Sequence, residues 1–240
     1  MYQKELSYYF SSITAYIVIG LFLVATGLFL WVIPGNWNIP DSGYASVDGL
    51  FALSPWLLML LCPALTMHIF AMEFSTGTWD LLLTKPMSLR RILAGKYFAA
   101  LTVAVMALLP CIIHYVAVGC IAEPSWNIDS GVFFGSFCGL IMLACAFTAI
   151  GVFASALGKN QIVAMITGVV CCFILFYGFD LLASTMYGSV ANAVEWFSLN
   201  HHYLSISRGI IDLGDIVYFL SVRIVFIICT HLILTIRNRK

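Results

Sequence analysis

Residues 132–156 read VFFGSFCGLIMLACAFTAIGVFASA, a run of 25 residues that contains no charged side chain. About 20 apolar residues in a helix cross roughly 30 Å of hydrocarbon, so this run is long enough to span a membrane. Its apolar residues are continuous and do not alternate with polar ones, which favours a helix over a strand of a membrane barrel. The stretch therefore predicts a transmembrane helix.

Five more apolar runs of similar length lie on either side of it, at 13–33, 50–71, 93–118, 162–183 and 216–236. Of the 240 residues, 62% are hydrophobic and 9% are charged, whereas soluble domains are about 45–50% apolar and about 25% charged. Lipid must therefore solvate most of the chain. We predict an all-α integral membrane protein whose residues 1–240 form one domain with six transmembrane helices.

The distribution of lysine and arginine predicts the orientation of these helices. With the N-terminus in the cytoplasm, nine cations fall on the inner side: Lys4, Lys85, Arg90, Arg91, Lys96, Lys159, Arg237, Arg239 and Lys240. Arg208 falls on the outer side. By the positive-inside rule, both termini are predicted to be cytoplasmic. The formal net charge is zero, so bulk electrostatics gives no reason to expect binding to nucleic acid.

Residues 1–12 are predicted to form an interfacial helix ahead of the first span. Apolar residues recur at the i, i+4, i+7 and i+8 spacing of one helix face: Tyr2, Leu6, Tyr9 and Phe10. The opposite face is polar: Gln3, Lys4, Glu5, Ser7 and Ser11. This pattern is typical of a helix that lies on the inner membrane surface. The alternative is an ordinary extension of the first span.

Polar groups within the predicted spans are few: His68, His114, Asp180, Arg223 and His231. Asp180 and Arg223 lie toward the outer ends of spans five and six, where we predict a structural ion pair; a role in a substrate path is the alternative. The histidines lack the H-E-x-x-H spacing of an intramembrane metalloprotease, so no metal ligand or catalytic residue is predicted.

The chain also lacks a phosphate-binding loop. Gly95-Lys96 has neither the upstream glycine at the required spacing nor a following Ser or Thr. We therefore predict that the chain holds no nucleotide or other cofactor and is not itself an ATPase.

The inner connection 72–92 and the outer connection 184–215 carry the remaining signals. Thr78 is predicted to cap a short helix with Asp80 in its first turn, Pro86 to end it, and Ser88 to cap the next helix. That short helix has an apolar group that consists of Trp79, Leu81, Leu82 and Leu83. The group indicates either docking to a cytosolic protein or a helix that lies on its own bundle. The outer segment is apolar enough to predict short helices that dip into the interface or the protein interior.

The inner connection closely resembles the signature of type 2 ATP-binding-cassette (ABC-2) permeases, roughly E-x-x-x-G-T-x-E-x-L-L-x-x-P-x-S followed by G-K. The matching residues are Glu73, Gly77, Thr78, Leu82, Leu83, Pro86, Ser88, Gly95 and Lys96. Asp80 stands where Glu is usual, and Met72 where an acid is common. Residues 151–164 and 197–220 also resemble family segments, and residues 4–16 resemble the opening of the gliding-motility-associated permeases.

The resemblance implies a permease of an ATP-driven exporter in the bacterial cytoplasmic membrane. Such permeases have an interfacial elbow helix, a cytosolic coupling helix and short re-entrant outer helices before the last span. They are similar in pairing with a second permease, identical or different, and with a cytosolic ABC ATPase on each half. By this likeness the coupling residues are Glu73, Gly77, Thr78, Asp80, Leu82, Leu83, Pro86 and Ser88, and the outer gate comprises Arg208, Gly209, Asp212 and Asp215. A membrane scaffold that anchors a motility or secretion complex and transports nothing is the competing interpretation.

Overall fold

The computed structural model describes residues 1–84, 87–124, 126–209 and 212–238, with the backbone alone at Leu83. Pro86, one of the predicted coupling residues, therefore lies outside the described residues, as do Lys85, Arg239 and Lys240. The helices are α1 (Tyr2–Ser11), α2 (Ile13–Trp31), α3 (Ile39–Ser42), α4 (Asp48–Thr66), α5 (Ala71–Thr76), α6 (Thr78–Leu83), α7 (Leu89–Leu108), the 3₁₀ turn η1 (Leu109–Cys111), α8 (Ile112–Ile121), α9 (Ser130–Leu157), α10 (Gln161–Phe173), the π-helical turn η2 (Ile174–Gly178), α11 (Phe179–Ser184), α12 (Ser189–Glu195), α13 (Leu199–Ile206) and α14 (Leu213–Arg237).

Six helical stretches in the described residues are long and apolar enough to cross a membrane, which confirms the predicted fold class. They are Ile13–Trp31, Asp48–Thr76, Leu89–Ile121, Ser130–Leu157, Gln161–Ser184 and Leu213–Arg237. Their bounds agree with the predicted runs to within a few residues. The third stretch contains Pro110, and the chain passes this proline as the 3₁₀ turn η1 between α7 and α8. A proline lacks the N–H that an α-helix needs, so the tighter turn accommodates it.

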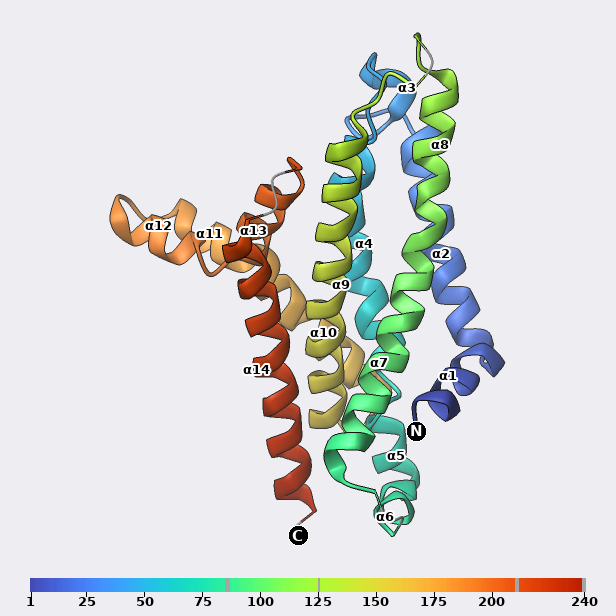
Figure 1. The fold of residues 1–240 in the computed structure, drawn as a ribbon. Coiled ribbons are helices and arrows are strands. Elements are labelled where there is room, and N and C mark those ends of the chain that lie inside the picture. Colours follow the sequence, from blue (N-terminus) through green and yellow to red (C-terminus); the bar gives the residue numbers. More distant parts are fainter. Residues whose placement is uncertain (85–86, 125, 210–211, 239–240) are drawn as a thin grey trace.

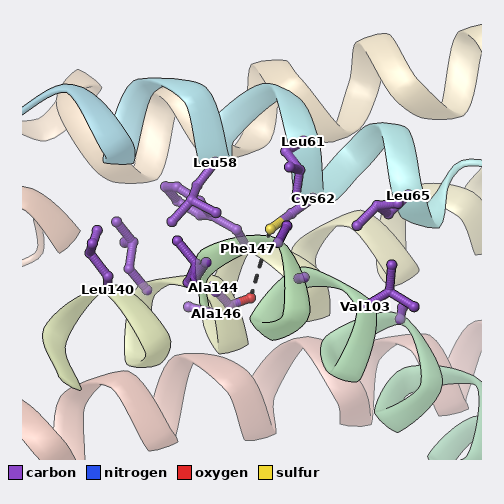
Figure 2. Close-up of a cluster of buried hydrophobic side chains, with 14 of the residues drawn as sticks. Leu58, Leu61, Cys62, Leu65, Val103, Leu140, Ala144, Ala146 and Phe147 are labelled. Carbon is purple, nitrogen blue, oxygen red and sulfur yellow. Dashed lines mark hydrogen bonds between the residues drawn. The ribbon is translucent and has the colours of Figure 1, made fainter. Parts of the chain in front are cut away.

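Helix α9 is the centre of the bundle. In its most apolar stretch, 72% of the residues are buried, against 17% in α14 and 22% in α2. The apolar core joins α9 to α4 and α7 (Figure 2); the residues labelled there are Leu58, Leu61, Cys62 and Leu65 of α4, Val103 of α7, and Leu140, Ala144, Ala146 and Phe147 of α9. The outer faces of α2 and α14 therefore have only lipid or another protein to contact.

Glycines let the neighbours of α9 approach closely. A Cβ at Gly151 would clash with Oγ1 of Thr66, the last residue of α4. A Cβ at Gly139 would lie 2.9 Å from the Ile206 side chain of α13. Small residues at such positions allow tight packing of helices within a membrane, where van der Waals contact holds them together.

The two termini lie at the same end of the bundle as α5 and α6, and α3 lies at the opposite end (Figure 1). Helix α1 is set at an angle to the spans, beside the end that carries α5 and α6. Short helices occupy the connection before α14, as the sequence predicts. Helices α11 and α12 extend sideways from the bundle (Figure 1), whereas α13 packs on α9 and buries Leu199, Tyr203 and Ile206.

Candidate functional site

A buried lysine joins three helices at the end of the bundle that carries α5 and α6. The Nζ atom of Lys96 on α7 donates to Glu73 Oε1 of α5 at 2.7 Å and to Glu5 Oε1 of α1 at 3.0 Å. It also donates to the main-chain oxygen of Ile69 at 3.1 Å. Lys96 is only 2% exposed. We call Lys96, Glu5 and Glu73 the Lys96 cluster.

Local geometry brings the three charges together. The helix is interrupted between α4 and α5. There the hydroxyl of Ser155 on α9 accepts hydrogen bonds from the N–H groups of Phe70 and Ala71 at 3.0 and 3.2 Å. The same hydroxyl donates to the main-chain oxygen of Met67 at 3.1 Å. These bonds satisfy backbone groups that the break leaves free and fix the start of α5, which carries Glu73 two residues later.

Gly95 permits the approach of α1. A Cβ at Gly95 would lie 2.9 Å from the Cβ of Met1, so any larger residue would push the start of α1 away from α7. Gly95 therefore lets α1 cross close to α7, and this crossing brings Glu5 within reach of the adjacent Lys96.

The position of Glu5 corrects one prediction. Glu5 was expected on the outward polar face of the first helix, but its side chain points into the bundle because Lys96 supplies a buried cation there. Tyr9, one turn later on the same face, is buried and donates to the main-chain oxygen of Leu65 at 2.8 Å. Burial, and then the neighbouring Glu5 carboxylate, raise the pKa of Tyr9 well above its usual value. Helix α1 is thus fastened to the bundle by an ion pair and a hydrogen bond.

Helix α6 follows α5 after one glycine in the left-handed region. Gly77 has φ +69°, ends α5 and occupies the cap position of α6. Thr78 was predicted to be that cap, but it is the first helical residue, and its hydroxyl pairs with that of Thr76 at 3.0 Å. Ser88 does occupy the cap position of α7, without a side-chain cap hydrogen bond.

The apolar residues of α6 are divided between the bundle and the outside. Trp79 and Leu82 are buried, and the Trp79 ring packs edge-on against the rings of Phe70 and Phe74. The predicted apolar group is therefore in part the packing face of α6 on its own bundle. Thr78, Asp80 and Leu81 remain exposed, Leu81 by 68%. The face free for a partner is mainly polar, with one acid and one leucine.

A cavity of about 410 Å³ separates α1 from α5 and α6. Glu5, His68, Glu73 and Lys96 line it, together with the exposed Leu81. The Glu73 Oε2 and His68 Nε2 atoms are buried without a hydrogen-bond partner. The Lys96 cluster is therefore at the base of a cavity and is not sealed into the core.

At the other end of the molecule, the predicted gate residue Asp215 binds a histidine. His202 of α13 is buried, with Nδ1 2.7 Å from Asp215 Oδ1 and Nε2 2.9 Å from the main-chain oxygen of Trp196. The Tyr218 ring stacks on His202 at 3.9 Å. These contacts connect α12, α13 and α14.

The other predicted gate residues do not join this group. Asp212 caps α14 by accepting from Gly214 N–H. Gly209 has φ +80°, and its backbone lies against Val132 of α9, so that a Cβ would be only 3.1 Å from the Val132 Cα. Arg208 is exposed.

The predicted ion pair between Asp180 and Arg223 is wrong. Asp180 Oδ2 accepts from Asn200 Nδ2 of α13 at 2.7 Å, because α11 turns sideways toward α13. The guanidinium of Arg223 instead lies over the rings of Tyr97 and Phe98 on α7, at 5.0 and 5.3 Å. The two charges thus belong to different faces of the bundle.

Sequence reasoning did not find the roles of Glu5 and His202. Glu5 follows Lys4 in the opening segment, and Lys96 closes the G-K motif, but no local pattern connects positions so far apart.

Among the described residues, no group of three or more His, Cys, Asp or Glu side chains could hold a metal ion.

The fold and these contacts define a polytopic α-helical membrane protein with an ion cluster at the end that bears α5 and α6. The sequence model of a family described as ABC-2 family transporter protein matches residues 46–236, more than half of the chain. The chain therefore belongs to the ABC-2 transporter family. It is a membrane subunit of an ABC transporter and not the ATPase, and members of this family generally work with a cytosolic ABC ATPase and a membrane partner. No curated protein sequence matches the chain.

Proposed function

We propose that this chain is the permease of an ATP-driven exporter, and that the Lys96 cluster transmits force from a docked ATPase to the membrane helices. The observation that carries the proposal is the junction of α1, α5 and α7 at Lys96, 2.7 Å from Glu73 and 3.0 Å from Glu5. Helix α6 adjoins α5 through Gly77 alone. A displacement of α6 therefore reaches the cluster within a few residues.

The coupling region in this proposal comprises residues 73–88. Thr78, Asp80 and Leu81 form the docking face, because these three described residues of α6 are exposed. Helix α6 is connected rigidly to α5 by Gly77, Trp79 and Leu82. Glu73 then transmits a displacement of α6 to α1 and α7. A partner can shift the helices only if its contacts differ between its ATP-bound and ATP-free states.

The proposal places both termini, α5 and α6 in the cytoplasm of a bacterial cell, with the protein in the cytoplasmic membrane. The excess of Lys and Arg on that side supports this orientation. At the outer end, α12 and α13 would form the gate, held by His202 and Asp215. A second permease, identical or different, would complete the transporter. The likeness of residues 4–16 to gliding-motility permeases supports a motility or secretion role, although these residues precede the matched range 46–236.

Substitution of the docking face tests the proposal. Leu81→Asp places a charge on an exposed residue of α6, and Tyr44→Asp is the matched control, because Tyr44 is 79% exposed beside α3 at the opposite end. We expect Leu81→Asp to weaken recovery of the co-purifying ATPase and to remove its stimulation by the permease. Tyr44→Asp should leave both unchanged. Leu82→Asp is not suitable, since Leu82 is buried and the variant would disrupt the packing of α6.

The competing function, a scaffold that transports nothing, gives a different result. A scaffold would be recovered without an ATPase, or with one whose rate does not respond to the permease. Equal ATPase stimulation in the Leu81→Asp and wild-type complexes would contradict the proposed docking face.

A further inference from the structure

Arg223 lies within a membrane span without an acidic partner. It lies near the middle of α14, 14 residues or roughly 21 Å of helix before the last residue, Arg237. Among the described residues it makes no hydrogen bond or ion pair, and its contacts are the faces of Tyr97 and Phe98. Charged side chains in a span are costly and usually have a partner or a function.

Arg223 lines a groove of about 380 Å³ between α7 and α14. Arg90 lies at the start of α7 and His231 toward the end of α14, and Leu93, Ile227 and Ile228 contribute to the apolar wall of the groove. No described residue that lines the groove is acidic. Phe98 and Ile228 are about half exposed, so the groove opens on the surface that faces lipid.

We propose that this groove binds one anionic phospholipid. The headgroup phosphate accepts hydrogen bonds from the Arg223 guanidinium, and an acyl chain lies along Ile227, Ile228 and Leu93. Arg90, at the far end of the groove, adds to its positive potential. Phosphate matches the planar guanidinium donors, and the apolar wall matches the chain. A soluble anion would gain nothing from that wall. A zwitterionic lipid carries the same phosphate but adds a headgroup ammonium, which no acid in the described lining would bind and which the two arginines repel. This proposal does not depend on coupling to an ATPase.

Native mass spectrometry of the purified chain tests the assignment. The chain in detergent is titrated with phosphatidylglycerol, with phosphatidylcholine and with inorganic phosphate. We expect a single phosphatidylglycerol to bind, with weaker binding of phosphatidylcholine and no competition from inorganic phosphate. Arg223→Gln should weaken binding about tenfold or more, since it removes charged hydrogen bonds to the phosphate. Arg223→Lys should retain part of the affinity.

Two further variants separate binding from folding. Arg237→Gln is the matched control, because Arg237 also lies on α14 over an aromatic ring, that of Phe74 at 3.6 Å, yet does not line the groove. Its lipid binding should equal that of the wild type. Ile228→Trp fills the groove and keeps every charge, and it should also abolish binding.

Three results would overturn the proposal: equal affinity of Arg223→Gln and wild type, equal binding of the two lipids, or competition by inorganic phosphate. A loss of co-purifying membrane protein in Arg223→Gln, with lipid binding intact, would assign the arginine to a protein partner.

Discussion

Replacement of Lys96 by methionine is the most direct test of the site. Lys96 holds two carboxylates at 2.7 and 3.0 Å, and the Lys96, Glu5 and Glu73 side chains are 2%, 10% and 20% exposed. At an effective dielectric constant of about 20, each contact contributes roughly 5–6 kcal/mol of attraction. Desolvation of each ion costs several kcal/mol, so the intact cluster contributes little net stability.

Removal of the lysine alone has a much larger effect. Lys96→Met leaves Glu5 and Glu73 close together without a cation, and loss of one partner of a buried pair typically costs about 3–5 kcal/mol. We expect a decrease of that size in the free energy of unfolding, measured by denaturant titration in detergent. Lys4→Met is the matched control, because Lys4 also lines the cavity but forms no ion pair in the described residues. It should change the free energy by no more than about 0.5 kcal/mol.

The triple variant Lys96→Met, Glu5→Gln and Glu73→Gln separates stability from coupling. It removes all three charges, so its stability should return to within about 1–2 kcal/mol of the wild type. If the cluster transmits force, this folded variant will still bind the ATPase but will no longer stimulate it. A Lys96→Met variant as stable as the wild type would refute the electrostatic argument. Normal ATPase stimulation in the triple variant would refute transmission through the cluster.

Three other substitutions test particular contacts. Gly77→Ala puts a Cβ on a residue with φ +69° and should destabilise the α5–α6 turn by about 1–2 kcal/mol, seen as faster hydrogen exchange in residues 71–84. Gly151→Val places side-chain atoms against Thr66 and should lower the unfolding free energy by about 1–3 kcal/mol; Gly20→Val, with open space around it, should not. Asp215→Asn removes the carboxylate that His202 binds, a hydrogen bond worth about 1.5–3 kcal/mol, and should increase proteolysis within α12 and α13. Unchanged cleavage would show that this hydrogen bond does not hold α13 on α14.

The sequence predicted the spans because their signal is local. An apolar run as long as 132–156 has few alternatives in any fold, and the observed helix Ser130–Leu157 extends it by two residues at one end and one at the other. The predicted runs 132–156 and 162–183 leave five residues between them, and in the structure residues 158–160 separate α9 from α10. Length and hydropathy are thus enough to predict the helices that cross the membrane.

The site depends on contacts between distant residues, which no local pattern reports. The sequence pattern placed Glu5 on the polar face together with Gln3 and Lys4, and only the crossing at Gly95 shows that it meets Lys96. Leu82 and Leu81 are equally apolar in sequence, yet one is buried and the other exposed. The prediction of an Asp180–Arg223 ion pair failed for a related reason. The sequence indicates how deep each residue lies in the membrane, but not toward which neighbour its helix face points.

The two ends of the molecule are connected through α9 and α4. Ser155 of α9 holds the break between α4 and α5, and Ser136, 19 residues earlier on α9, donates to the main-chain oxygen of Ser207 after α13 at 2.8 Å. Helix α9 is the most buried span, so it can act as the fixed frame against which both ends move. Helix α4 has contacts at both ends as well: Tyr203 of α13 donates to the main-chain oxygen of Phe51 at 2.7 Å, and α4 leads directly into α5. A movement that starts at α6 would therefore reach α4 through the continuous chain and α13 through the hydrogen bond between Tyr203 and Phe51.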